Sequence, residues 1–331
     1  MWSEFCLTSD RFRCMFATKK GDVMSFSWPT WEQFIYRVAR LRRVVVLAVF
    51  AAIVVAILYA ANVAVPLENV MFILGLVAIS VVFHVGLFPN VPLETMSIAP
   101  AMTAFLLALP RLATLASDAP VQYRDAAHVL IVVMAVIAAF AGTLVLNVLL
   151  SMLLYWGKAM NWRLNARAEF PMSVKAAHCA FGLRPDQLRG RVLTGSADAN
   201  GFFDVAVMSH HLTDPENGDQ PLIIKIDAKI LTSDQSTHEV MLVLASGQVT
   251  VCSYHFTPTV TGCRVDVSEI PGDFTIGMHV LFWLTDQQFD NLIEMADIAT
   301  RKCPRANGVS HAVSLFSLAG IVLSPRRPAL D

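Results

Sequence analysis

Three long stretches of apolar residues dominate the first half of the chain. Val44–Val63 contains no charged side chain, Asn69–Phe88 follows a short turn, and Ala126–Trp156 is the longest of the three. About 20 apolar residues are enough for a helix to cross the hydrocarbon core of a bilayer, and the longest stretch would extend about 46 Å as a helix. We therefore predict three membrane-crossing helices, the last of which tilts strongly or projects from the membrane as a stalk.

A fourth stretch, Met96–Ala116, is apolar but is interrupted by two prolines and an arginine. The distribution of basic residues along the chain indicates whether this stretch crosses the membrane. Four arginines lie within residues 37–43, directly before the first stretch, and residues 158–191 contain seven basic residues against two acidic ones. Basic residues mark the cytosolic ends of membrane helices, so both flanks are predicted to be cytosolic and the number of crossings must be even. The sequence therefore predicts a domain of four transmembrane helices within residues 30–158.

An amphipathic segment precedes the first stretch. Thr30 and Gln33 have the spacing of a helix capping box. Apolar side chains then share one helical face and basic residues crowd the end of the segment: Trp31, Phe34, Ile35, Val38 and Leu41, with Arg37, Arg40, Arg42 and Arg43. Either this helix lies in the headgroup layer with its arginines on anionic lipid, or it is simply the cytosolic flank of the first crossing.

Three polar side chains lie within the predicted crossings, namely His84, His128 and Asn147. A buried polar residue in a membrane can mark a transport path. The crossings contain no Asp, Glu or Lys to pair with these residues, so we expect hydrogen bonds between helices or an interfacial position. The pattern disfavours a pump or a transporter.

The hydrophobic period changes from helical to alternating after residue 159, which is typical of strands. The strand-like runs are Pro171–Ala176, Arg191–Thr194, Phe202–Met208, Leu222–Leu231, Val240–Leu244, Val249–His255, Cys263–Val267 and Phe274–Trp283. Clusters of turn-forming residues separate them, and Asp286–Arg301 is an amphipathic helix. We predict a cytosolic, mainly β domain over residues 159–304, a small antiparallel barrel or sandwich with a C-terminal helix.

Two terminal segments fit neither domain. Residues 1–29 are mixed and polar, which indicates either a tail or a translation start at Met24 instead of Met1. Val309–Leu323 is apolar, but a crossing there would put the two arginines that follow it on the wrong side of the membrane. We expect the apolar tail over residues 305–331 to lie on the membrane or against the C-terminal domain.

Composition agrees with a membrane protein. Hydrophobic residues make up 55% of the chain, charged residues only 15%, and the mean hydropathy is +0.55; soluble chains are about one quarter charged. The net charge of −1 gives no basis for binding a nucleic acid polymer. We expect a multi-pass protein of the bacterial inner (cytoplasmic) membrane with cytosolic N- and C-termini, whose partners are the lipid bilayer and proteins of a membrane complex.

Enzyme motifs are missing from the sequence, which contains no GxSxG, phosphate loop, HExxH or GxGxxG. One polar loop gathers His210, His211, Asp214, Glu216 and Asp219. Such a composition is far more often a solvated turn than a cation site. We therefore predict no enzymatic activity, no metal and no cofactor.

One ordered set of motifs stands out in the second half. Arg163 and Arg167 lie four residues apart after the last apolar stretch, AEFPMSVKA follows as a predicted strand, and the turn SADANG lies between two further strands. A strand MHVLFWL then leads into the helix TDQQFDNLIEM. Over about residues 163–301 this order resembles the PilZ family, small β-barrels with an RxxxR arm, a [DN]xSxxG turn and often a closing helix.

The resemblance implies cyclic di-GMP as the ligand. It implies that Arg163 and Arg167 clamp phosphates and the acceptor edge of guanine. It also implies that the turn containing Ser196, Asp198 and Gly201 approaches the second base. In this turn Ser196 and Asp198 stand where the family carries Asp or Asn and then Ser.

Two functions follow as hypotheses. In the first, the chain is a membrane-anchored regulatory protein that responds to cyclic di-GMP and controls an exopolysaccharide or motility machine. In the second, it is a non-enzymatic structural subunit of a secretion or conjugation assembly, anchored by its helices and docking partner proteins through the cytosolic domain.

Overall fold

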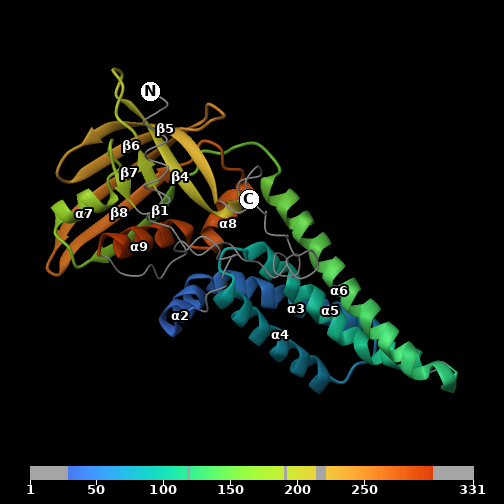
Figure 1. Ribbon diagram of the computed structural model, residues 1–331. Coiled ribbons are helices and arrows are strands. Elements are labelled where there is room, and N and C mark those ends of the chain that lie inside the picture. Colours follow the sequence, from blue (N-terminus) through green and yellow to red (C-terminus); the bar gives the residue numbers. More distant parts are fainter. Residues whose placement is uncertain (1–28, 118–119, 190–191, 214–220, 301–331) are drawn as a thin grey trace, which may run out of the picture.

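A computed structural model describes residues 29–117, 120–189, 192–213 and 221–300 (Figure 1). The predicted terminal tails, apart from Pro29, lie outside the described residues. So do the alternative start sites and most of the polar loop that follows His211.

The first half folds into helices that match the predicted segments closely. Their bounds are α2 Trp31–Arg40, α3 Arg42–Asn62, α4 Leu67–Leu87, α5 Pro92–Ser117, the 3-10 turn η1 Val121–Tyr123, and α6 Arg124–Tyr155. The capping box predicted at Thr30 is formed, with reciprocal hydrogen bonds between Thr30 and Gln33. Helices α3, α4, α5 and α6 are each long and apolar enough to cross a membrane.

Small residues bring the long helices together. Ala48 and Ala52 of α3 are fully buried one turn apart and form a cluster with Val77 and Val81 of α4 and Ala99 of α5. Helix α6 packs along α5 and leaves most of its apolar side chains exposed. Its 32 residues extend about 48 Å, so it runs the length of the bundle and reaches the second domain (Figure 1).

The second half is a mainly β domain built on one antiparallel sheet. Its strands are β1 Leu164–Phe170, β2 Leu188–Arg189, β3 Val192–Thr194, β4 Phe202–Thr213, β5 Pro221–Ser233, β6 Thr237–Val243, β7 Val249–Thr259 and β8 Gly262–Ile270. They are ordered β1-β8-β7-β6-β5-β4-β3-β2, and the sheet curls like part of a barrel (Figure 1). The predicted combination of a helical domain and a mainly β domain is confirmed.

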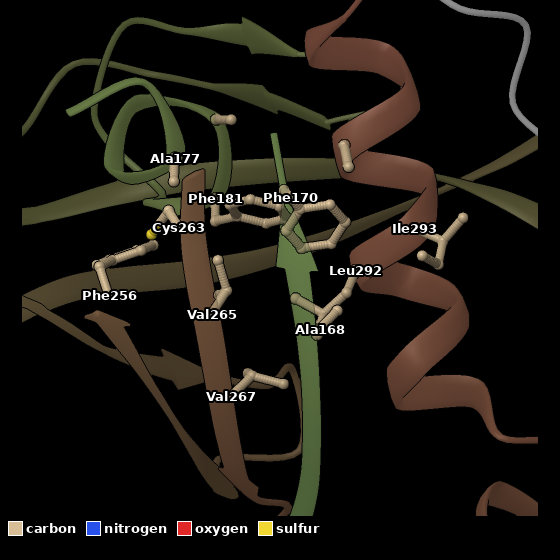
Figure 2. Packing of buried hydrophobic residues seen from close by; sticks show 12 residues of the cluster. Ala168, Phe170, Ala177, Phe181, Phe256, Cys263, Val265, Val267, Leu292 and Ile293 are labelled. Carbon is tan, nitrogen blue, oxygen red and sulfur yellow. The ribbon is translucent and has the colours of Figure 1, made fainter. Parts of the chain in front are cut away.

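Three helices accompany the sheet. Helix α7, Val174–Phe181, connects β1 to β2, and α8, Ile276–Leu284, and α9, Gln287–Ala299, follow β8. Helix α9, predicted as the amphipathic segment, packs its apolar side against the sheet and α7. Figure 2 shows Leu292 of α9 close to Phe170 of β1 and Phe181 of α7 in this core.

Two predicted strands are wrong. Pro171–Ala176 contains the start of α7, where Ser173 accepts a hydrogen bond from the backbone of Ala176. Phe274–Trp283 contains most of α8, where Thr275 caps the helix in the same way. In both places a short apolar run has no decisive period, and the N-cap residue determines the outcome.

Candidate functional site

A cavity of about 210 Å³ lies between the sheet and α9. Alternation along the strands directs every second side chain into it, including Val205 and Val207 of β4 and Ile226 of β5. Helix α9 closes the cavity with Leu292 and Met295. Most of the lining is aliphatic, which makes the space suitable for an apolar molecule.

Polar side chains from neighbouring strands interrupt this apolar lining. Cys252 and Tyr254 of β7 and Glu269 of β8 line the cavity together, and the register pairs Cys252 with Glu269. Gln288 of α9 donates a hydrogen bond to Glu269. Burial raises the pKa of the Glu269 carboxyl, the Gln288 hydrogen bond opposes this shift, and Asp273 adds to it.

A single arginine lines the cavity among the described residues. Arg189 of β2 donates through Nη1 to the backbone carbonyls of Ala180 and Gly182, the latter at 3.2 Å. Burial lowers the Arg189 pKa, and the neighbouring Tyr254 opposes that change. Burial also raises the pKa of Tyr254, so its hydroxyl stays protonated at neutral pH. The cavity therefore combines one cation, a phenol and acidic groups.

The opposite side of α9 contacts the helical domain. Asp290 is 1% exposed and accepts hydrogen bonds from the Tyr36 hydroxyl, at 3.0 Å, and from Arg40 of α2. Just before α9, Asp286 pairs with Arg43 at 2.6 Å and with Arg42 at 3.1 Å. One helix thus has the cavity on one face and α2 on another.

These contacts disagree with one of the two interpretations of the α2 segment, in which its arginines lie on anionic lipid. Arg37 and Arg40 are 7% and 4% exposed, and Arg37 donates to the carbonyl of Gly86 at 3.1 Å. Arg43 also stacks over the ring of Trp283, 4.5 Å from its centroid. Because Arg37 and Arg40 are buried against protein, lipid headgroups do not contact them in this arrangement.

A second connection runs from the end of α6 to α8. Thr275 donates to the carbonyl of Leu154, and the backbone of Leu154 lies so close to Gly277 that an added Cβ would be 2.4 Å from it. His279 is bonded to the Met160 carbonyl at 2.7 Å. The two domains are therefore held by contacts on both α8 and α9.

The two predicted arginines lie at one edge of the sheet. Arg163 precedes β1, Arg167 is on β1, and both are exposed. Arg167 forms an ion pair with Asp266 of the neighbouring strand β8. Its charge is therefore already partly compensated within the sheet.

The predicted turn precedes β4, and β8, β7, β6 and β5 separate it from β1 in the sheet order. Ser196 donates to Asp186 at 2.6 Å, and Asp198 accepts from the backbone of Asn200 and Phe202 at 2.8 Å each. Gly201 has φ +80°, a conformation that favours glycine. The turn's polar side chains therefore already stabilise its own conformation.

One polar residue of the helical domain has partners that the sequence prediction missed. His84 of α4 is buried and bonded to Glu94 at 3.1 Å and to Thr95 at 2.9 Å, both on α5. The expected hydrogen bonding between helices is confirmed for His84. The expectation that it has no acidic partner is wrong, because α5 begins at Pro92 and includes Glu94.

Sequence reasoning missed the cavity residues Arg189, Tyr254 and Glu269. A signal was present for Glu269, since it continues the inward-facing positions of Val265 and Val267 along β8. A carboxyl group at an inward position is unusual and indicates a functional site.

No protein-family model matches this chain, and no curated protein matches it. Several solved structures align with 40–43% of it, in the C-terminal part. Protein MLL2253 from Mesorhizobium loti is 11% identical, with 97% of its length covered and a TM-score of 0.30. Protein CV1439 from Chromobacterium violaceum is 12% identical, with 95% covered and a TM-score of 0.31. Ara h 8.0201 is 11% identical, with 100% covered and a TM-score of 0.32. Similarity at this level assigns the chain to no family.

Proposed function

We propose that this chain is a membrane-anchored binding protein whose cytosolic domain takes up a small, mostly apolar molecule. In this proposal α3, α4, α5 and α6 cross the bacterial inner membrane. The basic segments before α3 and after α6 keep both ends of this helical bundle in the cytosol. The β domain then lies at the cytosolic surface, and α9 connects its cavity to the membrane helices.

The cavity is the observation that carries the proposal. Its volume of about 210 Å³ exceeds the ~150 Å³ of an engineered apolar cavity that binds benzene. It falls below the ~300 Å³ at which drug-sized sites begin. A ligand with one or two rings, or a short acyl chain, fits this range.

The placement of α9 supports a regulatory role. Leu292 and Met295 face the ligand space, whereas Asp290 is held by Tyr36 and Arg40 of α2. A ligand that orders or shifts α9 acts directly on a buried ion pair at the entrance to the first crossing. A binding event couples to another domain only through such differential contacts.

Co-purification tests the proposal. The full chain is purified in detergent, bound small molecules are extracted with solvent, and mass spectrometry compares wild type with Val207→Phe, which fills the cavity. Ile223→Phe is the matched control, because Ile223 is exposed on the same pair of strands and does not line the cavity.

We expect a species below about 300 Da that is retained by wild type and Ile223→Phe and is lost from Val207→Phe. A second filling variant, Ile226→Phe, covers the case in which Val207→Phe fails to fold. Equal recovery from wild type and both folded filling variants would refute cavity binding.

Cyclic di-GMP remains a second candidate, supported by the exposure of Arg163 and Arg167 beside β1. Calorimetric titration of cyclic di-GMP into the full chain tests it, next to an Arg163→Ala/Arg167→Ala variant. Micromolar binding that is lost in the variant would favour the receptor, and an absence of heat would favour the cavity ligand or a structural subunit of an envelope assembly.

A further inference from the structure

Two of the polar side chains that line the cavity, Tyr254 and Glu269, lie on adjacent strands. The register pairs Tyr254 with Val267 and Cys252 with Glu269, so Tyr254 and Glu269 are diagonal neighbours on one face of the sheet. Diagonal neighbours in an antiparallel pair lie about 7–8 Å apart at the backbone, within reach of aromatic and long side chains. One small ligand group placed between them can contact both.

Both side chains retain hydrogen-bonding capacity. Within the part of the chain that the structure describes, the Tyr254 hydroxyl has no hydrogen-bond partner. Gln288 occupies one carboxyl oxygen of Glu269, and the other has no partner among the same residues. A phenol donates and a carboxyl oxygen accepts, so the two offer complementary positions.

We propose that the ligand of this cavity is a small neutral alcohol or phenol, whose hydroxyl donates to Glu269 and accepts from Tyr254. This inference rests on the proposed function and specifies its ligand class. The aliphatic lining holds the hydrocarbon body of the ligand. The paired polar groups fix its orientation, with the hydroxyl toward β7 and β8.

Two other ligand classes fit less well. A pure hydrocarbon would displace water from the Tyr254 hydroxyl and the free Glu269 oxygen without replacing its hydrogen bonds, and such a loss is costly. A carboxylate would place a negative charge next to Glu269 and Glu294, which both line the cavity. Arg189 could offset that charge, but its Nη1 already donates to two backbone carbonyls at the end of α7.

The test uses three probes with one ring system: naphthalene, naphthol and naphthoate. Thermal unfolding of the full chain in detergent is measured as each probe is titrated. The same titrations with Val207→Phe subtract partitioning into micelles. We expect naphthol to bind at least about tenfold more tightly than naphthalene, because one or more hydrogen bonds are made only with the hydroxyl.

Tyr254→Phe and Glu269→Leu identify the groups responsible. Tyr254→Phe keeps the ring that stacks on Phe256, so its packing is preserved. We expect either change to reduce the preference for naphthol over naphthalene to less than about threefold while naphthalene binding is retained.

The outcomes separate the two proposals. Equal binding of naphthol and naphthalene, abolished by Val207→Phe, would overturn the hydroxyl assignment and leave cavity binding intact. Tightest binding of naphthoate, lost in Arg189→Gln, would also overturn it and assign an anionic ligand. Stabilisation of wild type and Val207→Phe to the same extent by all three probes would instead refute cavity binding itself.

Discussion

The ion pair between Arg40 and Asp290 should dominate the attachment of the β domain to the helices. Their side chains are 2% and 1% exposed, and Asp290 also accepts a hydrogen bond from Tyr36. Arg37, buried nearby, has its pKa lowered by burial and by Arg40 and raised by Asp290. Asp290 is therefore the counter-charge to two buried arginines.

We predict that Asp290→Ala destabilises the folded chain by about 3–5 kcal/mol, because it breaks a buried ion pair by removing one partner. Tyr36→Phe removes one hydrogen bond to the same carboxylate and should cost about 1 kcal/mol. The double variant Arg40→Met/Asp290→Leu should recover only part of the loss: apolar groups of similar size can replace a buried pair at little or no cost, but Arg37 still loses the Asp290 charge.

The assay is equilibrium unfolding of the purified chain in detergent. Arg42→Ala is the matched control: Arg42 also pairs with an aspartate before α9, but its side chain is 58% exposed, so its removal should change stability by less than about 1 kcal/mol. If Asp290→Ala cost no more than Arg42→Ala, the pair would not join the domains as we argue.

Three further predictions concern the β domain and its junction with α6. Burial lowers the pKa of His238 from 6.5 to about 4. Between these two pH values the unfolded chain binds more protons than the folded chain. The free energy of unfolding should therefore fall by up to about 3 kcal/mol as the pH drops from 6.5 to about 4. His238→Gln should flatten that profile in urea titrations, and an unchanged profile would exclude His238 as its source. Because the Glu269 pKa is raised, its ionisation opposes folding at neutral pH, so Glu269→Gln should raise the melting temperature there, with a gain that shrinks in acid. A gain independent of pH would contradict this cause. Gly277→Ala should cost about 1–3 kcal/mol because the new methyl meets the backbone of Leu154. Gly75→Ala, with nothing within 4 Å of the added Cβ, should be neutral in the same unfolding assay; equal effects would refute the steric argument.

The long helices were predictable because their sequence signals are unambiguous. The four apolar helices and α9 were placed within a few residues of their bounds, since a span of 20 or more apolar residues or a clear amphipathic repeat leaves little choice. Helix α8 was not predictable in the same way. Its nine residues, IGMHVLFWL, are apolar apart from His279 and show no clear repeat, so only the Thr275 cap distinguishes helix from strand.

The cavity could not be predicted for a different reason. It forms because the curled sheet places Arg189 of β2 and Tyr254 of β7 at the same cavity, although four strands separate β2 from β7 in the sheet order. That curvature is a property of the whole sheet, and no local pattern encodes it. The Asp290–Arg40 pair was equally hidden, because its residues are 250 positions apart.

That separation also sets an order of events during synthesis. Translation at about 5–20 residues per second places Asp290 in the chain roughly 10–50 s after Arg40. During this interval α3 and α4 are complete, while the Asp290 carboxylate that binds Arg40 has not yet been made. We expect anionic headgroups to occupy the guanidiniums of α2 until the β domain docks, so that the lipid contact predicted for α2 belongs to the assembling chain and the ion pair to the finished one.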